Sequence, residues 1–230
     1  MSDSEEDETT VQHVNIVFIG EPNVGKTSLI RRFCYEDFLR QYTPTTGADF
    51  YIKRIMLPTA NPIGNKQEIV LKLTDIGGKE RKAHMLDKYL FKADMIVLVY
   101  DITNAESFEN MCAWIDTIGS LITSPPLSAI IGNKCDLEHQ RGVRLDRTRQ
   151  FVKENGFYNY LTSAKTGEAT NSCIVELVAK YVGVPLTKLQ KEENAVLKVE
   201  LHVADKLAES VARRKAHEQQ TKSSTVCLIQ

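Results

Sequence analysis

The segment at residues 20–27 constrains the fold and the chemistry of this chain more than any other. It reads Gly-Glu-Pro-Asn-Val-Gly-Lys-Thr and fits the pattern G-x-x-x-x-G-K-[ST]. The apolar run at 14–19 predicts a strand before it, and the spacing of apolar residues at 27–33 predicts a helix after it. In that setting the glycines let backbone N–H groups point at phosphate oxygens, and the helix dipole favours the negative charge. We therefore expect a phosphate-binding loop in which Lys26 reaches the β- and γ-phosphates and the Thr27 hydroxyl ligates Mg2+.

The chain beyond this loop alternates between predicted strands and predicted helices. Strands are expected at 49–57, 68–74, 95–100, 127–132 and 157–162, and helices at 105–122, 145–155 and 171–182. Such alternation implies right-handed crossovers, and the turn-rich segment 58–67 makes the first two of these strands an antiparallel hairpin. The predicted fold class is α/β, of the P-loop NTPase type, with a mostly parallel six-stranded sheet and helices on both faces.

Composition narrows the possible classes of protein. The 230 residues carry a formal charge of -1, which argues against a dedicated nucleic-acid binder. The longest strongly apolar run, 95–100, is far shorter than the ~18 residues that span a bilayer, and residues 1–10 lack the apolar core of a signal peptide. The five cysteines are widely spaced and odd in number, so we expect reduced thiols and neither disulfides nor a zinc site. These features predict a cytosolic protein.

Three parts of the chain differ in composition. Residues 1–10 carry five acidic residues and no basic one, so we expect a disordered acidic leader at 1–12. The predicted domain occupies 13–184. Beyond it, 185–230 is rich in Lys, Glu, Ala and Val and then in Gln, Thr and Ser, and we expect a tail outside the domain.

Two further motifs follow predicted strands. Asp75 begins the sequence Asp-Ile-Gly-Gly, where a carboxylate can hold the Mg2+ hydration shell and the Gly78 N–H can approach the γ-phosphate. Asn133-Lys134-Cys135-Asp136 closes the strand at 127–132, and the Asp136 carboxylate can accept from N1–H and the 2-amino group of guanine. Adenine offers no such pair of donors, so Asp136 opposes the alternative of an ATP-using P-loop enzyme.

The segment Ser163-Ala164-Lys165 follows the next strand and could present a backbone N–H to guanine O6. With it, four motifs stand in an order that resembles small GTPases of the Ras superfamily, and specifically Rab proteins. Rab-like segments include 46–50, 98–103 and 107–110, and the Rab subgroup numbered twenty-eight is similar at 1–6, 75–78, 85–89, 132–134, 136–139 and 154–157. The resemblance covers about residues 14–184, the whole predicted domain.

The resemblance implies a set of site residues. Thr45 would complete Mg2+ coordination and contact the γ-phosphate, Phe38 would stack on guanine and Tyr42 would close over the phosphates. Ordinary loop packing is the alternative for Phe38 and Tyr42. The residues expected at the nucleotide are Glu21, Pro22, Asn23, Val24, Gly25, Lys26, Thr27, Ser28, Phe38, Tyr42, Thr45, Gly78, Asn133, Lys134, Asp136, Ser163, Ala164 and Lys165. Those expected at Mg2+ are Thr27, Thr45 and Asp75, and those expected in catalysis are Lys26, Thr45, Gly78 and Lys79.

Lys79 departs from the family pattern, which usually has Gln at this position to orient the attacking water. An amide both donates and accepts a hydrogen bond, whereas an ammonium only donates. We therefore expect slow intrinsic GTP hydrolysis, with an activating protein supplying the missing group as Rab activators do through an Arg and a Gln. The alternative is that Lys79 is a solvated loop lysine. Pro22 also departs from the pattern, and its ring removes one backbone donor.

The tail ends in Cys227-Leu228-Ile229-Gln230, which fits the C-a-a-X prenylation pattern and favours farnesylation of Cys227. A single prenyl chain anchors only marginally, and the basic residues near Arg213 offer a second signal, so we expect reversible membrane binding. Residues 196, 199, 203, 207 and 211 are apolar and fall on one face of a possible helix. That face would bind a partner or a membrane, or alternatively would pack on the domain or fray in solution.

Together these features predict a GTP-controlled molecular switch that is monomeric. Mg2+ and GTP would order 41–48 and 77–88, which would then bind effectors, an exchange factor and an activating protein. The resemblance implies recruitment of effectors to membranes in vesicular, endosomal or ciliary traffic. The alternative function is a GTP-binding recruitment scaffold with negligible hydrolysis, for which Lys79 is the main support.

Overall fold

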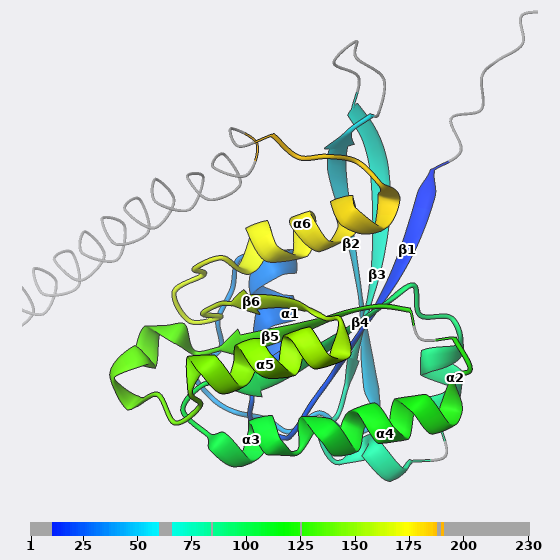
Figure 1. Cartoon of the computed structure of the whole chain (residues 1–230). Helices are drawn as coiled ribbons and strands as arrows, with labels where there is room; N and C mark the ends of the chain where they lie inside the picture. The colour runs from blue at the N-terminus through cyan, green and yellow to red at the C-terminus, as the bar shows by residue number, and fades with distance from the viewer. Residues whose placement is uncertain (1–10, 60–65, 84, 125, 188–189, 191–230) are drawn as a thin grey trace, which may run out of the picture. The chain divides into compact units, whose positions relative to one another are not determined.

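A computed structural model describes residues 11–59, 66–83, 85–124, 126–187 and 190 (Figure 1). The chain divides into two compact units, 1–187 and 188–230, and the second falls outside the described residues except for Gln190. The predictions for residues 1–10, for the middle of the hairpin loop at 60–65 and for the tail helix and Cys227 therefore lie outside the described residues.

Six strands form one sheet in the order β2-β3-β1-β4-β5-β6, which confirms the predicted strand number. The strands are β1 (Gln12–Ile19), β2 (Ala48–Pro58), β3 (Lys66–Ile76), β4 (Met95–Asp101), β5 (Leu127–Asn133) and β6 (Tyr158–Leu161). All neighbouring pairs are parallel except β2 and β3, which form the predicted antiparallel hairpin. Every residue of β4 is buried, as expected for a central parallel strand that is covered on both faces.

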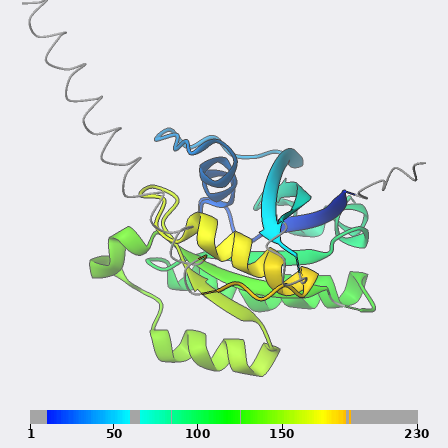
Figure 2. The ribbon, with the colours of Figure 1, turned by 90° about the horizontal axis from the view of Figure 1, so that it is seen from above.

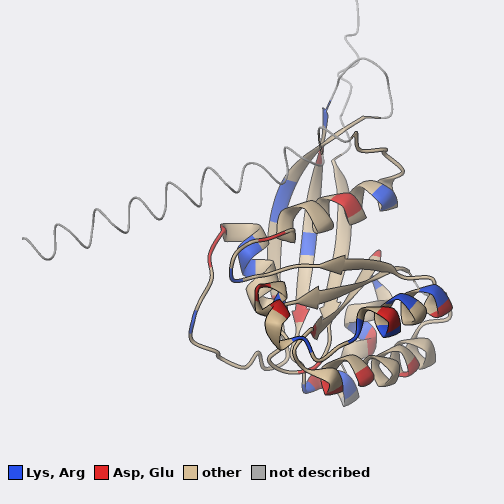
Figure 3. Cartoon of the chain, turned by 60° about the vertical axis from the view of Figure 1, so that its left-hand side comes forward, with Lys and Arg blue, Asp and Glu red and all other residues tan. Residues whose placement is uncertain are grey.

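Helices cover both faces of the sheet (Figure 1, Figure 2). They are α1 (Lys26–Tyr35), α2 (Leu86–Phe91), α3 (Ala105–Glu109), α4 (Met111–Leu121), α5 (Leu145–Asn155) and α6 (Thr170–Val182). Apolar residues of α1 and α6 pack with one core cluster, and those of α2, α3, α4 and α5 pack with a second cluster. Acidic and basic residues are interspersed along the described helices, strands and loops, consistent with the near-neutral composition (Figure 3).

Several elements differ from the sequence-based expectation. The single helix expected at 105–122 is divided at Asn110, whose backbone (φ -68°, ψ -9°) joins α3 to α4. α2 and the 3-10 turns η1 (Glu80–Lys82) and η2 (Cys135–Gln140) were not predicted, because each is too short for a periodic apolar pattern. β1 begins at Gln12, two residues before its apolar run, since the backbones of Gln12 and His13 pair with β3. The leader predicted at 1–12 thus overlaps β1 by one residue.

The parallel direction of the strands decides where the site can form. The carboxyl ends of β1, β3, β4, β5 and β6 lie at the same edge of the sheet, so the loops that follow them meet there. The chain order reverses around β1, which has β3 on one side and β4 on the other. Ligand sites of open α/β sheets form at such a reversal, outside the carboxyl ends of the strands.

Candidate functional site

One cavity of about 450 Å³ is lined by the loops at this edge of the sheet. The volume falls within the range of small-molecule binding sites. The sequence-predicted residues that line it are Pro22, Asn23, Gly25, Lys26, Thr27, Ser28, Phe38, Tyr42, Thr45, Gly78, Lys79, Asn133, Lys134, Asp136, Ala164 and Lys165. The fold thus brings together, around one cavity, segments that are separated by more than a hundred residues in the chain.

The loop at 20–25 is shaped by its glycines and by Lys26. Gly25 has a φ of +95°, and a Cβ there would lie 2.3 Å from Nδ2 of Asn133, so only glycine fits this approach. Nζ of Lys26 donates to the carbonyls of Gly20 at 2.8 Å and Glu21 at 3.0 Å. Burial lowers the pKa of Lys26 to about 8, although the carboxylates of Asp75 and Glu21 oppose the shift. An anion bound in the loop would favour the charged ammonium.

Three oxygen-bearing side chains from separate segments converge beside this loop. Oγ1 of Thr27 lies 3.0 Å from Oγ1 of Thr45, and Oδ2 of Asp75 accepts from these hydroxyls at 2.5 and 3.3 Å, respectively. Asp75 is fully buried, and its other oxygen, Oδ1, has no hydrogen-bond partner among the described residues. Burial raises the pKa of Asp75 above its ordinary value, opposed by the two hydroxyls and by Lys26.

This set of donors fits a magnesium ion. Mg2+ takes oxygen ligands, keeps several of its waters and is bound by few protein groups together with substrate phosphates. A cation would also compensate the buried Asp75 carboxylate and its unpartnered oxygen. The described residues contain no cluster of three or more His, Cys, Asp or Glu that could hold a metal ion.

Asn133, at the end of β5, connects the loop at 20–25 with the loop that follows β6. Its Nδ2 donates to the carbonyl of Val24 at 2.8 Å, and its Oδ1 accepts from the backbone N–H of Ala164 at 3.0 Å. Arg32 on α1 donates to the carbonyls of Ala164 and Lys165, both at 2.9 Å. The loops that follow β1, β5 and β6 are therefore held as one unit.

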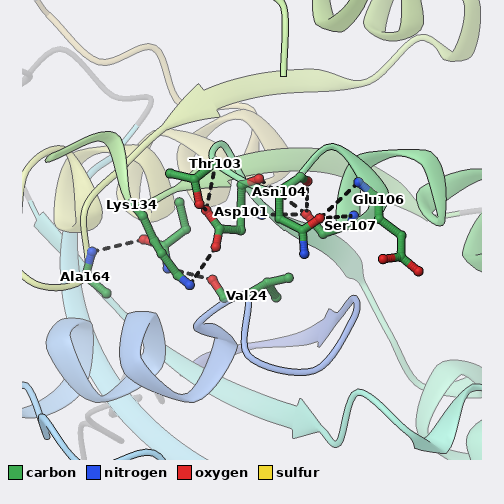
Figure 4. Close-up of polar contacts among 9 residues, drawn as sticks. Val24, Asp101, Thr103, Asn104, Glu106, Ser107, Lys134 and Ala164 are labelled. Atoms are coloured by element: carbon green, nitrogen blue, oxygen red, sulfur yellow. Dashed lines mark hydrogen bonds and ion pairs between the residues drawn. The ribbon is translucent and has the colours of Figure 1, made fainter. Parts of the chain in front are cut away.

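The polar groups at this end of the cavity are also connected to one another. Oδ1 of Asp136 accepts from the Ser163 hydroxyl at 2.6 Å, and its Oδ2 lies 3.8 Å from Nζ of Lys165. Nζ of Lys134 forms an ion pair with Oδ2 of Asp101 at 2.6 Å (Figure 4). Hydrogen bonds and ion pairs of this kind fix the side-chain positions before a ligand arrives, which lowers the entropic cost of binding.

Four predicted residues of the described part of the chain contribute without lining the cavity. Val24 is buried in the core and offers its carbonyl to Asn133, and Asp75 acts through its contacts with the two threonines. Ser163 is buried behind Asp136. The Glu21 side chain contacts Trp114 and Arg81.

Some residues of the site were missed from the sequence. Asp101, which forms an ion pair with Lys134, directly follows the apolar run predicted as a strand at 95–100. A carboxylate at the end of a buried strand was the signal that could have revealed this residue. Arg31, Tyr51 and Leu137 also line the cavity, but they lie in regular elements or a short turn and no motif marks them.

The loop residues Phe38, Tyr42 and Lys79 border the cavity in different ways. Phe38 is half-buried against the core cluster that includes α1, whereas Tyr42 is 55 % exposed. Lys79 is exposed and lines the cavity next to Gly78.

Within the described residues, no helix has the length and apolar character that crossing a bilayer requires.

Comparison with known proteins identifies the family. The family model described as "Ras family" matches residues 15–182. A curated relative, "Ras-related protein Rab-28" of Caenorhabditis elegans, is 33 % identical over 219 residues, covering 94 % of this chain and 86 % of the relative. The family-model match begins within β1 and includes the other five strands and the loops that line the cavity. The chain therefore belongs to the Ras family of small GTPases and is a Rab-type member of it.

Proposed function

We propose that this chain is a membrane-recruited switch that binds GTP with Mg2+, hydrolyses it slowly to GDP, and engages effectors only in the GTP form. The observation that carries the proposal is the convergence of the loops after β1, β3, β5 and β6 on one cavity. GTP binding and hydrolysis are general properties of the Ras family, to which the chain belongs. The residue roles, the slow rate and the role in membrane traffic are our proposal.

Guanine would bind at the Asp136 end of the cavity. The Asp136 carboxylate would accept from N1–H and from the 2-amino group, with Ser163 holding the carboxylate in place at 2.6 Å. An N–H of the segment 163–165 would donate to guanine O6, with the amide of Ala164 shared with Asn133. Phe38 would cover the base edge. Because ATP would leave these groups unpaired, the site would discriminate strongly against it.

The phosphates would occupy the loop at 20–27. Lys26 would exchange its carbonyl partners for β- and γ-phosphate oxygens, and Tyr42 would close over them. Thr27 and Thr45 would hold Mg2+ directly, with Asp75 holding its hydration shell; bound there, the ion neutralises phosphate charge. The N–H groups of Thr45 and Gly78 would contact the γ-phosphate, so its loss on hydrolysis would release 41–48 and 77–88.

Lys79 would make hydrolysis slow. The ammonium can stabilise phosphate charge, but it cannot accept a hydrogen bond from the attacking water. Phosphoryl transfer depends mainly on positioning and charge stabilisation, so the missing acceptor costs rate. An activating protein that inserts an Arg and a Gln would supply what the chain lacks. The same residue supports the second candidate, a GTP-binding scaffold that does not hydrolyse appreciably.

Membrane recruitment would depend on the tail. Farnesylation of Cys227 together with the basic residues around Arg213 would give reversible attachment to the cytoplasmic face of a membrane. As a Rab-type protein, the chain would act in vesicular, endosomal or ciliary traffic, which is the role that its resemblance to Rab proteins implies. Metabolic labelling with an alkyne farnesyl analogue tests the lipid, because wild type should be labelled and Cys227→Ser should not.

The central proposal is tested by binding and by turnover. In competition binding, GTP should displace a fluorescent GDP analogue about a hundredfold more effectively than ATP does, or better. In a turnover assay, the release of phosphate from GTP should accelerate sharply when a Rab activator is added. Equal competition by ATP contradicts the guanine site. GTP binding without phosphate release, with or without an activator, would favour the scaffold.

A further inference from the structure

The side chain of Glu21 connects two elements that the sequence did not associate with each other. Its Oε1 accepts a hydrogen bond from Nε1 of Trp114 at 3.1 Å and forms an ion pair with NH1 of Arg81 at 3.5 Å. Glu21 is the second residue of the phosphate-binding loop, Arg81 lies in η1 directly after Gly78 and Lys79, and Trp114 lies in α4. One carboxylate oxygen therefore joins the phosphate-binding loop to the segment 78–81 and to a helix of the second core cluster.

Burial makes this contact energetically significant. Trp114 is fully buried, and the side chains of Arg81 and Glu21 are only 30 % and 23 % exposed. NH1 of Arg81 is buried and makes no hydrogen bond among the described residues, so the Glu21 carboxylate is what compensates its charge. Removing the Glu21 carboxylate would leave the buried NH1 of Arg81 without a facing negative charge, which is unfavourable.

The backbones of the two segments also touch. A Cβ on Gly78 would lie 2.2 Å from the backbone N of Pro22 and 2.6 Å from the carbonyl carbon of Glu21. Proline has no N–H, so Gly78 can lie against the backbone nitrogen of Pro22 without leaving a backbone donor unpaired. The Glu21–Arg81 pair therefore acts on a segment that already lies against the phosphate-binding loop.

We infer that Glu21 is a positioning residue that sets where Gly78 and Lys79 stand relative to the γ-phosphate, acting through Arg81, and that Trp114 holds Glu21 for this role. The inference rests on the proposed function and deepens it. GDP has no γ-phosphate, so correct placement of Gly78 benefits GTP alone. Glu21 should consequently affect the preference for GTP over GDP rather than the affinity for guanine nucleotides in general.

The direct test compares Glu21→Gln and Arg81→Gln in the full-length chain. The affinities for GDP and for a non-hydrolysable GTP analogue are measured by competition against a fluorescent GDP analogue. We expect each substitution to weaken the GTP analogue about tenfold relative to GDP, because contacting charged residues couple at about that strength. The double variant should bind the GTP analogue, relative to GDP, no more weakly than the more affected single variant does, since the two residues act as one unit. A matched control is the exposed pair Arg147–Glu109, 3.0 Å apart, where Glu109→Gln should leave the ratio unchanged.

A spectroscopic readout is available because Trp114 is the single tryptophan of the chain. Exchange of GDP for the GTP analogue should change its emission in the wild type, and Glu21→Gln and Arg81→Gln should reduce that change at least twofold. Trp114→Phe keeps an aromatic ring but removes the N–H donor, and it should lower the GTP-to-GDP preference in the same direction as Glu21→Gln. Thermal unfolding of each GDP-bound variant identifies any that is not folded.

The outcomes separate this inference from the proposed function. The inference would be overturned, with guanine binding left intact, if Glu21→Gln and Arg81→Gln weakened the binding of GDP and of the GTP analogue equally. It would also be overturned if the effects of the two substitutions on the GTP-to-GDP preference simply multiplied in the double variant. A wild-type chain that binds no guanine nucleotide would overturn the proposed function, and the inference with it.

Discussion

Lys134 and Asp101 form an ion pair of 2.6 Å between Nζ and Oδ2 at the carboxyl ends of two neighbouring strands. Asp101 is the last residue of β4, and Lys134 directly follows Asn133, which is in register with Asp101 across the sheet. Oδ1 of Asp101 accepts in addition from the N–H and the hydroxyl of Thr103, at 2.9 and 2.7 Å. The lysine that borders the Asp136 end of the cavity is therefore held by a carboxylate that is itself fixed in place.

Replacing Asp101 with Asn should speed the release of bound nucleotide. The substitution preserves the shape but removes the charge that holds Lys134, a loss of about 1.5 kcal/mol at the low end of the range for a hydrogen bond to a charged group. We expect about tenfold faster dissociation of a fluorescent GDP analogue, measured by stopped flow or manual mixing with excess GDP. Asp116→Asn makes the same change on the exposed side of α4 and should not alter the rate. Equal rates for both variants would show that the ion pair does not support the site.

Asp136→Asn should remove the preference for guanine. Its amide N–H would face the N1–H and 2-amino donors of guanine, so GTP affinity should fall roughly 10³-fold or more. Xanthine carries an acceptor oxygen in place of the 2-amino group, and xanthosine triphosphate should therefore bind the variant better than GTP does. Competition titrations with the two nucleotides measure the change. If GTP bound the variant as tightly as the wild type, Asp136 would not contact the base.

Lys79→Gln should accelerate intrinsic hydrolysis. The amide can accept a hydrogen bond from the attacking water, and better positioning of a reactant is commonly worth about 10- to 100-fold in rate. Single-turnover release of phosphate from preloaded GTP gives the rate directly. Lys72→Gln makes the same change at an exposed position of β3 and should leave the rate unaltered. An unchanged rate in Lys79→Gln would mean that Lys79 is only a solvated loop residue.

The cysteines of the described residues should differ in reactivity. Burial raises the pKa of Cys34 to about 11 and that of Cys135 to about 12, and Cys173 is buried, whereas Cys112 is exposed. The thiolate is the reactive form, so at pH 8 only roughly one Cys34 in a thousand is ionised, and its rate should rise about tenfold per pH unit below its pKa. Limited alkylation at pH 8 followed by peptide mass spectrometry should find Cys112 modified first. Faster modification of Cys34 or Cys135 than of Cys112 would contradict this order.

The sequence predicted the elements that carry a strong apolar pattern and the motifs that stand at their ends. The buried run of β4 and the ends of α5 were identified correctly, because burial on both faces leaves a continuous apolar run and burial along one stripe of a helix leaves a clear period. α2 has only Leu86 and Leu90 as buried residues, and two positions cannot define a period. The break at Asn110 lies within a segment whose apolar spacing predicted one continuous helix.

Prediction of the site was limited in a similar way. The residues of the loop at 20–27 and Asp136 are marked by short motifs, so the sequence alone could name them as candidates, and all of them except Gly20, Glu21 and Val24 line the cavity. The partners that hold them are not marked, because contacts such as Lys134 with Asp101 and Glu21 with Trp114 join residues 33 and 93 positions apart. Such contacts follow from the register of the parallel strands and from helix packing, which a single sequence does not reveal.

The bonds of Asn133 to Val24 and Ala164 have a consequence for folding. Because these loops meet around one cavity, a bound nucleotide would hold together segments from the first and the last strand, and its binding free energy would add to the stability of the whole domain. A ligand present at about a thousand times its dissociation constant raises the free energy of unfolding by about 4 kcal/mol. The midpoint temperature of unfolding should therefore rise with the concentration of nucleotide. A preparation stripped of nucleotide should unfold at a lower temperature.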